Sequence, residues 1–280
     1  GNPDIIHTTP DYSIFNKRKN TPLVLTFHNY VLDQYMSPYS STLQRLHYAT
    51  DLRFLTRKAL KNATVLTAVS QFIANLVADD MKVEKKIRVV YNGIDENLFS
   101  PRKHARNGKI RVLFSGNLSR RKGANLLPEI ASHLNPGIEI IYTTGLRATR
   151  KLPDHPALTN TGSIPYSEMP DLYRSTDILL FPSVREGFGL AAAEAMACGL
   201  PVVATNCSAL PELVDHGRGG LLCAPGDTVA FANSVNRLAA SASLRREMGE
   251  YNRAKVEKQF TVRRMVQAYN DLFEETLDKR

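Results

Sequence analysis

The sequence has few of the features that mark several common protein classes. Its three cysteines include no CxxC pair, and the odd number argues against a disulfide framework, so a reducing cytoplasm is expected. No apolar run is long enough to span a bilayer. The motifs HExxH and GxSxG and the Walker lysine motif are missing, and no spacing of potential ligands indicates a metal site.

What the chain does contain is typical of a globular protein with excess positive charge. Hydrophobic residues make up 43% and charged residues 22%, and 280 residues suit two domains of ordinary size. The net charge is +9, and residues 1–105 carry 14 Lys and Arg against 9 Asp and Glu. This balance suits an anionic membrane surface, an anionic substrate or nucleic acid, but a basic globular protein without such a partner fits equally well. No helix-turn-helix, zinc or RRM signature favours nucleic acid.

Short β-rich runs alternate with helical patterns along the whole chain. This alternation predicts an α/β fold with parallel sheets covered on both faces. The pattern is interrupted at residues 97–108, where Pro, Gly and basic residues indicate a linker. We therefore expect two Rossmann-like domains with a cleft between them. A long helix is expected over residues 41–63, and further helices are expected over residues 71–81, 123–134 and 228–240.

The stretch "REGFGLAAAEAMACGLP" combines a glycine loop with a helix of small residues and follows a predicted strand. Gly187 and Gly189 allow the backbone to approach a ligand closely, and the N–H groups of Phe188, Gly189 and Leu190 open the helix. Such N–H groups form an anion or hydroxyl site. In doubly wound sheets, ligands bind at this end of the strands.

Two carboxylates flank this loop. Glu186 precedes the glycines and can accept hydrogen bonds from a polyhydroxylated ligand. Glu194 stands one turn after the start of the helix and could bind a vicinal diol such as a ribose. The alternative is that Glu194 is solvated at a helix edge and that the glycines only make a turn.

The segment "LFSGNLSRRKGANLL" is a second strand–loop–helix pattern. Gly116 closes the strand, and Arg120, Arg121 and Lys122 precede the helix. Cations at a helix N-terminus are unfavourable unless an anion binds there, so this position favours a phosphate site. A solvated basic loop is the alternative.

Other basic residues give weaker signals. His28 and His7 each stand at the carboxyl end of a predicted strand, where a lone histidine is more often structural. Arg53, Arg57 and Lys61 share one face of the predicted 41–63 helix. That face could contact a membrane surface, although a solvated face is the commoner explanation.

Together these segments resemble one known family. "EGFGLAAAE" is similar to the E-x7-E motif of the retaining glycosyltransferases of family 4, which have the GT-B fold. Other similar segments occur in the family's order: "VVYNGIDENLF", "LFSGNLSRRKG", "GSIPYSEMPDLYRSTDILLFPSVREGFG" and "GLPVVATNCSALPELVDHGRGGLL". The resemblance covers nearly the whole chain and is strongest over residues 86–240.

The resemblance implies roles for individual residues. Glu186 would contact the donor sugar, Glu194 the ribose hydroxyls and Lys122 the diphosphate. His28 would lie near the sugar and the reacting oxygen. The implied catalytic residues are His28, Lys122 and Glu186, and the implied donor-binding residues are Gly116, Asn117, Arg121, Ile164, Gly187, Phe188, Gly189, Leu190 and Glu194.

Two departures from the family pattern matter. Asn117 stands where the family usually has an arginine, so Arg120 or Arg121 would supply that charge. The family's first strands and glycine-rich loop are also missing before residue 1, so the first domain is expected to be incomplete. The expected domains are an acceptor-side domain (1–104), a donor-nucleotide domain (105–258) and a C-terminal helix (259–280) packing back toward the first domain.

The resemblance also implies a reaction. A sugar would pass from a UDP- or GDP-sugar to the hydroxyl of a glycan or lipid-linked acceptor, with retention of configuration and without a metal or cofactor. The expected location is the cytoplasm, with peripheral contact at the inner face of an anionic membrane through the basic first domain. The alternative is a fragment that binds nucleotide sugars without turnover.

Overall fold

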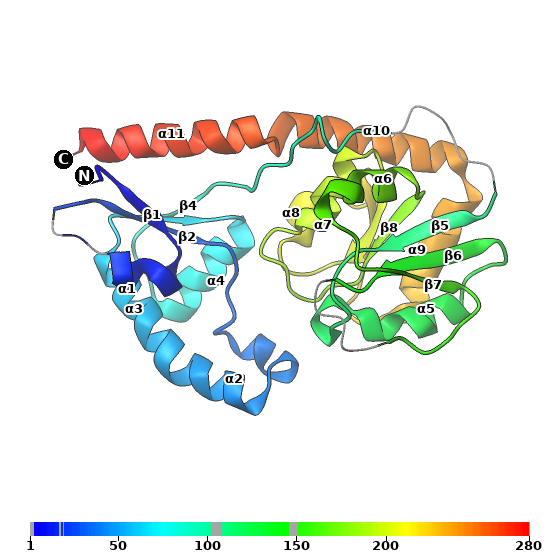
Figure 1. The fold of residues 1–280 in the computed structure, drawn as a ribbon, viewed down its shortest axis with the longest axis horizontal. Helices are drawn as coiled ribbons and strands as arrows, with labels where there is room; N and C mark the ends of the chain where they lie inside the picture. The colour runs from blue at the N-terminus through cyan, green and yellow to red at the C-terminus, as the bar shows by residue number, and fades with distance from the viewer. Residues whose placement is uncertain (1–2, 17, 19, 102–107, 146–150, 280) are drawn as a thin grey trace. The chain divides into compact units, whose positions relative to one another are not determined.

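The computed structural model describes residues 3–16, 18, 20–101, 108–145 and 151–279. The chain divides into two compact units (Figure 1). Unit 1 comprises Gly1–Gly93 and Arg263–Arg280, and unit 2 comprises Ile94–Val262. The boundary expected at residues 104 and 105 falls outside the described residues. The two units are described separately below, and the cleft expected between them stays a prediction.

Unit 1 is built on a four-stranded parallel sheet with the order β1-β2-β3-β4. The strands are β1 (Ile6–Thr8), β2 (Leu23–Phe27), β3 (Val65–Ala68) and β4 (Ile87–Val89). Every residue of β2 is buried, as expected for a strand covered on both faces. The core joins these strands to one face each of α3 (Arg53–Asn62) and α4 (Gln71–Met81).

The helix expected over residues 41–63 is confirmed over residues 42–62, but it is not α-helical throughout. It consists of α2 (Thr42–His47) and α3, joined by a π-helical turn at Tyr48–Leu52. A π-turn inserts an extra residue into the helical repeat, which sequence periodicity alone does not reveal. Unit 1 also contains the short helix α1 (Ser13–Asn16) and the 3-10 turns at Pro10–Tyr12 and Gln34–Tyr39.

The C-terminal helix α11 (Val262–Asp278) packs on the sheet of unit 1. The Tyr269 hydroxyl lies 3.1 Å from Thr26 Oγ1, and Glu275 Oε2 lies 2.5 Å from Arg88 Nη1. His7 contacts the Tyr269 ring, and its Nε2 lies 2.7 Å from Thr26 Oγ1. His7 is therefore part of the packing between β1 and α11.

Unit 2 contains a six-stranded parallel sheet with the order β10-β9-β8-β5-β6-β7. The strands are β5 (Ile110–Phe114), β6 (Ile138–Thr143), β7 (Leu158–Gly162), β8 (Ile178–Phe181), β9 (Val202–Thr205) and β10 (Gly220–Cys223). From β5 the chain first builds outward through β6 and β7. It then returns to the other side of β5 with β8 and builds outward in the opposite direction.

Helices cover both faces of this sheet (Figure 1). One face forms a core with α5 (Leu127–Ser132) and α9 (Thr228–Ala240), while α7 (Leu190–Ala197) packs against β8, β9 and α6 (Met169–Arg174). The remaining helices are α8 (Leu210–Leu213) and α10 (Ala242–Gln259). Consecutive strand residues such as Val112 and Leu113, which point to opposite faces of the sheet, are both fully buried, which explains the continuous apolar runs in the sequence.

The helix expected over residues 123–134 also needs correction. A 3-10 turn at Arg120–Lys122 precedes it, a second at Ala124–Leu126 opens it, and only Leu127–Ser132 is α-helical. Gly123 between the turns is left-handed, and Pro128 lies in the first turn of α5. The expected α/β class with two Rossmann-like parallel sheets is confirmed. Within the described ranges, no helix has the length and apolar character needed to cross a membrane.

Candidate functional site

The candidate site lies where the strand order of unit 2 reverses. Strands β5 and β8 are neighbours, with Val112 opposite Ile178, but the chain leaves them in opposite directions. The loops after the two strands therefore diverge at the carboxyl edge of the sheet, which is where open α/β sheets bind ligands. These two loops carry both segments that the sequence singled out.

The loop after β5 presents a row of cations. Ser119 caps the turn at Arg120–Lys122, its Oγ accepting a hydrogen bond from Lys122 N at 3.3 Å. Gly123 then adopts a φ of +77°, and a Cβ there would lie 2.3 Å from the carbonyl oxygen of Pro182. Gly123 thus allows the basic turn to pack directly against the loop after β8.

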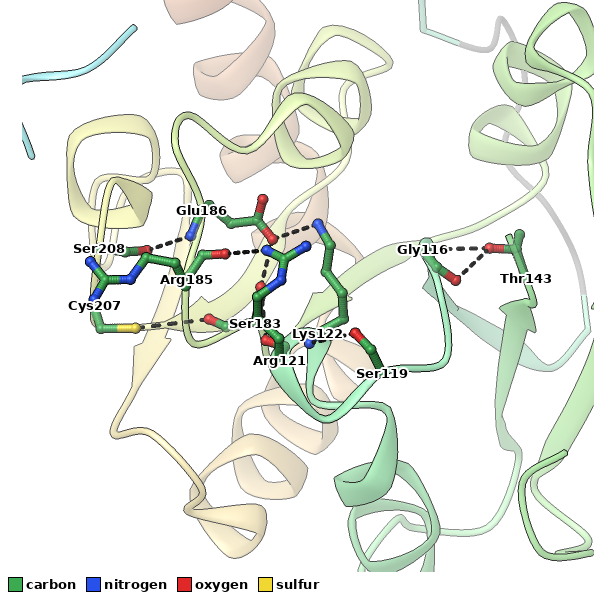
Figure 2. A network of polar contacts seen from close by, with 10 residues as sticks. All are labelled: Gly116, Ser119, Arg121, Lys122, Thr143, Ser183, Arg185, Glu186, Cys207 and Ser208. Carbon is green, nitrogen blue, oxygen red and sulfur yellow. Dashed lines mark hydrogen bonds and ion pairs between the residues drawn. The ribbon is translucent and has the colours of Figure 1, made fainter. Parts of the chain in front are cut away.

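The loop after β8 brings a carboxylate to that basic turn. Glu186 Oε1 accepts hydrogen bonds from Lys122 Nζ at 2.6 Å and from Ser183 Oγ at 2.5 Å (Figure 2). Lys122 Nζ also lies 5.3 Å from the centre of the Phe181 ring. The structure therefore joins two of the predicted site residues, Lys122 and Glu186, in one ion pair.

Backbone contacts hold the two loops in register. Val184 N donates to Arg121 O at 2.9 Å, and Arg121 Nη1 donates to Arg185 O at 2.7 Å (Figure 2). Ser208 Oγ accepts from Glu186 N at 3.1 Å, although Ser208 has a φ of +54°, which is strained for a residue with a Cβ. Arg121 therefore lies within the site, whereas Arg120 is exposed.

The start of α7 supplies backbone donors beside this pair. Gly189 precedes the helix with a φ of +104°, and its carbonyl accepts from Ala192 and Ala193. The N–H groups of Gly189 and Leu190 come before these first helical bonds, in the position where helix N–H groups meet anions. Phe188 is buried against Phe260 at a ring distance of 5.4 Å, and Gly187 is buried beside it.

Glu194 is buried inside α7, so the alternative of a solvated helix edge was wrong. Its side chain is 8% exposed, and its Oε2 accepts a hydrogen bond from Tyr173 of α6 at 2.9 Å. Burial raises the pKa of Glu194 to about 7, although the Tyr173 hydrogen bond lowers it. A carboxylate with a pKa near neutrality is typical of functional sites.

Further predicted residues surround the two loops. Gly116 N donates to Thr143 Oγ1 at 3.0 Å, which ties the β5 loop to the end of β6. Asn117 is exposed and lies against Gly145, where a Cβ would come 1.9 Å from Asn117 Oδ1. Ile164 is half-buried just beyond the end of β7. The roles of these residues stay predictions.

His28 belongs to unit 1. It follows β2 and lines a cavity of about 360 Å³, whose wall also includes Tyr12, Tyr30, Leu52 and Thr56. The pKa of His28 is lowered because the surrounding protein displaces part of its water. Its expected part in the reaction stays a prediction.

Four site residues were not singled out from the sequence. Ser183 and Arg185 stand within the β8 loop, and their position next to Glu186 was the available signal. Tyr173 and Ser208 come from other segments, and no local pattern connects them to the carboxylates that they contact. Across the described ranges, no group of three or more His, Cys, Asp and Glu side chains could hold a metal ion.

Two family models match the chain. "Glycosyltransferase Family 4" matches residues 1–98, and "Glycosyl transferases group 1" matches residues 109–241. N-acetyl-alpha-D-glucosaminyl L-malate synthase of Bacillus anthracis is 28% identical over 243 residues, covering 81% of this chain and 63% of the relative. Sulfoquinovosyl transferase SQD2 of Arabidopsis thaliana is 26% identical over 286 residues, covering 91% and 54%. The chain thus spans less than two thirds of these two relatives.

Solved structures share the fold. Sucrose-phosphate synthase from Thermosynechococcus elongatus superposes with a TM-score of 0.84 at 22% identity, covering 99% of this chain and 74% of that one. Anabaena HepE in complex with UDP-glucose gives 0.77 at 23% identity, covering 99% and 79%. Two models of glycosyltransferase families thus match different parts of this chain, and the chain shares the GT-B fold of these structural neighbours.

Proposed function

We propose that this chain belongs to an enzyme that transfers a sugar from a UDP- or GDP-sugar to an acceptor hydroxyl, with retention of configuration and without a metal. The observation that carries the proposal is the Lys122–Glu186 pair at the switch point of unit 2. It places a cation and a carboxylate side by side, and a sugar nucleotide likewise presents a diphosphate next to sugar hydroxyls. The named relatives are sugar transferases or synthases, which supports the proposal.

The diphosphate would bind between Lys122, Arg121 and the first N–H groups of α7. Negative charge builds on the β-phosphate as the sugar leaves, and cations with helix dipoles stabilise that charge. Side-chain cations thus supply what a metal ion supplies elsewhere. Asn117 and Gly116 would line the same phosphate loop.

The rest of the donor would extend to either side of the diphosphate. Glu186 accepts hydrogen bonds from the sugar, and Gly187 and Phe188 border it with their backbone. Glu194 accepts from the ribose hydroxyls, and Ile164 borders the base. The HepE structures include a complex with UDP and glucose and a complex with UDP-glucose, which supports a donor of this kind.

Unit 1 would carry the acceptor. His28, at its cavity after β2, would lie near the reacting oxygen, and the acceptor would be a glycan or a lipid-linked glycan. The second candidate is binding without turnover. It is favoured by the position of the Lys122–Glu186 pair and of Glu194 within unit 2, because that unit could bind a donor whether or not unit 1 takes an acceptor.

A thermal-shift panel of sugar nucleotides would identify the donor, since a ligand at about 100 times its Kd stabilises by roughly 2.7 kcal/mol. Calorimetry with the selected donor and its bare nucleoside diphosphate then tests the site. Lys122→Ala should weaken the diphosphate about tenfold or more, but hardly the nucleoside, because a charge-assisted contact is worth about 1.5–3 kcal/mol.

The carboxylates should differ from each other in the same titrations. Glu194→Ala should weaken nucleotide and donor alike, whereas Glu186→Ala should weaken only the donor. Exposed Glu129 of α5 provides the matched control, and Glu129→Ala should change neither Kd. Equal losses of bare nucleotide in the two site variants would contradict the assignment. Donor binding without release of nucleoside diphosphate to any acceptor would favour the second candidate.

A further inference from the structure

Unit 1 exposes large apolar side chains in one region. Among the described residues, six large apolar or aromatic side chains are the most exposed, and five of them lie between residues 12 and 54. On α2, Leu43 is 80% and Leu46 63% exposed, and on α3 Phe54 is 65% exposed. Tyr12 and Phe15 belong to the Pro10–Tyr12 turn and α1, which pack beside α3. Large exposed apolar side chains on neighbouring elements are typical of interaction surfaces.

The helix α2 has no buried residue at all. Figure 1 shows it continuing from α3 away from the sheet of unit 1. Its start is fixed locally by a capping box: Ser41 Oγ accepts from Gln44 N at 3.2 Å, and Gln44 Oε1 accepts from Ser41 N at 2.8 Å. The capping box therefore stabilises α2 without tertiary packing of its side chains, and its leucines remain available to a partner.

Basic side chains accompany these apolar ones. Residues 42–62 contain five Lys and Arg and one Asp. Arg53 faces inward and pairs with Asp80 at 2.9 Å, but the other four are exposed. The α2–α3 surface is defined here by Leu43, Leu46, Phe54, Arg45, Arg57, Lys58 and Lys61.

We propose that the α2–α3 surface binds an anionic lipid bilayer, with its apolar side chains entering the interface. Leucine and phenylalanine flanked by Lys and Arg are typical of helices that lie in a membrane interface. A symmetric contact with a second copy would bring the basic residues of both copies together, which is unfavourable. Nucleic acid would attract the cations but would leave Leu43 and Leu46 exposed. This inference does not depend on the proposed reaction.

The chain contains no tryptophan, so a single introduced indole reports on its own surroundings. With Leu43→Trp, vesicles of equal parts phosphatidylglycerol and phosphatidylcholine should shift the emission to the blue, and brominated lipids should quench it. Val229→Trp on α9, another exposed apolar position, is the control and should respond to neither.

Sedimentation with the same vesicles measures affinity. The double variant Leu43→Ser and Leu46→Ser should bind at least about tenfold more weakly, because it loses the burial of two leucines. Each of Arg57→Gln and Lys58→Gln should lower binding to the mixed vesicles roughly fivefold, with no effect on phosphatidylcholine alone. Val229→Ser should bind like the wild type to the mixed vesicles and to phosphatidylcholine alone.

Three results would overturn the proposal. One is no sedimentation of the wild type with the mixed vesicles. Another is equal loss in the double variant and in Val229→Ser. The third is a wild-type dimer in light scattering that the double variant abolishes without any vesicle binding, which would make a second copy the partner. Since every side chain changed on α2 is exposed, unchanged melting temperatures should exclude misfolding.

Discussion

If Glu194 binds the ribose as proposed, its raised pKa predicts that donor binding depends on pH. With a pKa of about 7, the buried carboxyl is mostly neutral at about pH 6 and mostly ionised at about pH 8. A ribose diol donates two hydrogen bonds, so it binds the ionised form. At a pH below this pKa, the free energy needed to remove the proton from Glu194 therefore reduces the binding free energy of the donor.

The magnitude follows from the ionised fraction. Between about pH 8 and about pH 6 this fraction falls roughly tenfold, so the Kd should rise roughly tenfold, or about 1.4 kcal/mol. The ligand should be a sugar nucleotide rather than a nucleoside diphosphate. Its diphosphate is esterified at both ends and has no terminal phosphate group titrating near pH 6.

Glu194→Gln is the matched variant, because it keeps the shape and the acceptor oxygen but cannot ionise. Calorimetry should show that Glu194→Gln binds the donor more weakly and that its Kd no longer rises roughly tenfold between about pH 8 and about pH 6. Any effect of His28 on the Kd is common to both proteins and therefore drops out of the comparison. Parallel pH profiles for wild type and Glu194→Gln would refute the reasoning, since the titrating group would then lie elsewhere.

The raised pKa of Glu194 also affects the stability of the fold. Whereas donor binding should strengthen as the pH rises, stability should fall. The unfolded carboxyl loses its proton near its ordinary pKa of 4.5, whereas the folded one keeps it up to about pH 7. The unfolded state therefore binds fewer protons in this window, and stability falls as pH rises through it. Wild type should lose about 3 kcal/mol relative to Glu194→Gln between about pH 4.5 and pH 7, measured by urea unfolding.

Three further predictions concern the surroundings of the site. Tyr173→Phe removes a hydrogen bond that lowers the pKa of Glu194, so the midpoint of the binding profile should move to higher pH; an unmoved midpoint would mean that the hydroxyl does not act on the carboxylate. Gly123→Ala should lower the free energy of unfolding by about 1–2 kcal/mol of backbone strain plus the cost of displacing Pro182. Gly137 is also left-handed but has open space around it, so Gly137→Ala should cost only the strain. Equal losses of stability in the two variants would contradict the close approach of Gly123 to Pro182. EDTA should leave donor affinity unchanged, because side-chain cations face the diphosphate, and recovery that requires Mg²⁺ would overturn the metal-free proposal.

Sequence patterns predicted the elements better than their irregularities. The helices α4 and α9 begin and end where the apolar periodicity predicts, at Gln71–Met81 and Thr228–Ala240. The π-turn at Tyr48–Leu52 and the two 3-10 turns before α5 were not predicted. Periodicity reports which residues face the core, and a single extra residue in one turn changes that pattern too little to be recognised.

The candidate site shows the same limit at longer range. The sequence indicated both loops, because each has a strand, small residues and charges in order. It could not show that Lys122 and Glu186 form a pair, since they are 64 residues apart and meet only because β8 returns to lie beside β5. Nor could the sequence show that the Tyr173 hydroxyl donates a hydrogen bond to Glu194, because that contact depends on how α6 packs against α7.

The Lys122–Glu186 pair has a consequence for what the site selects. The two side chains are only 18% and 10% exposed, so a ligand that captures one of them leaves the other charge poorly compensated. A free diphosphate would draw Lys122 away from Glu186, and a free sugar would draw Glu186 away from Lys122. A sugar nucleotide engages both at once, because its diphosphate and its sugar hydroxyls are covalently adjacent. In the proposed site, we therefore expect the pair to favour the intact donor over either of its parts. Cleavage of the bond between sugar and diphosphate would remove that advantage and favour release of the products.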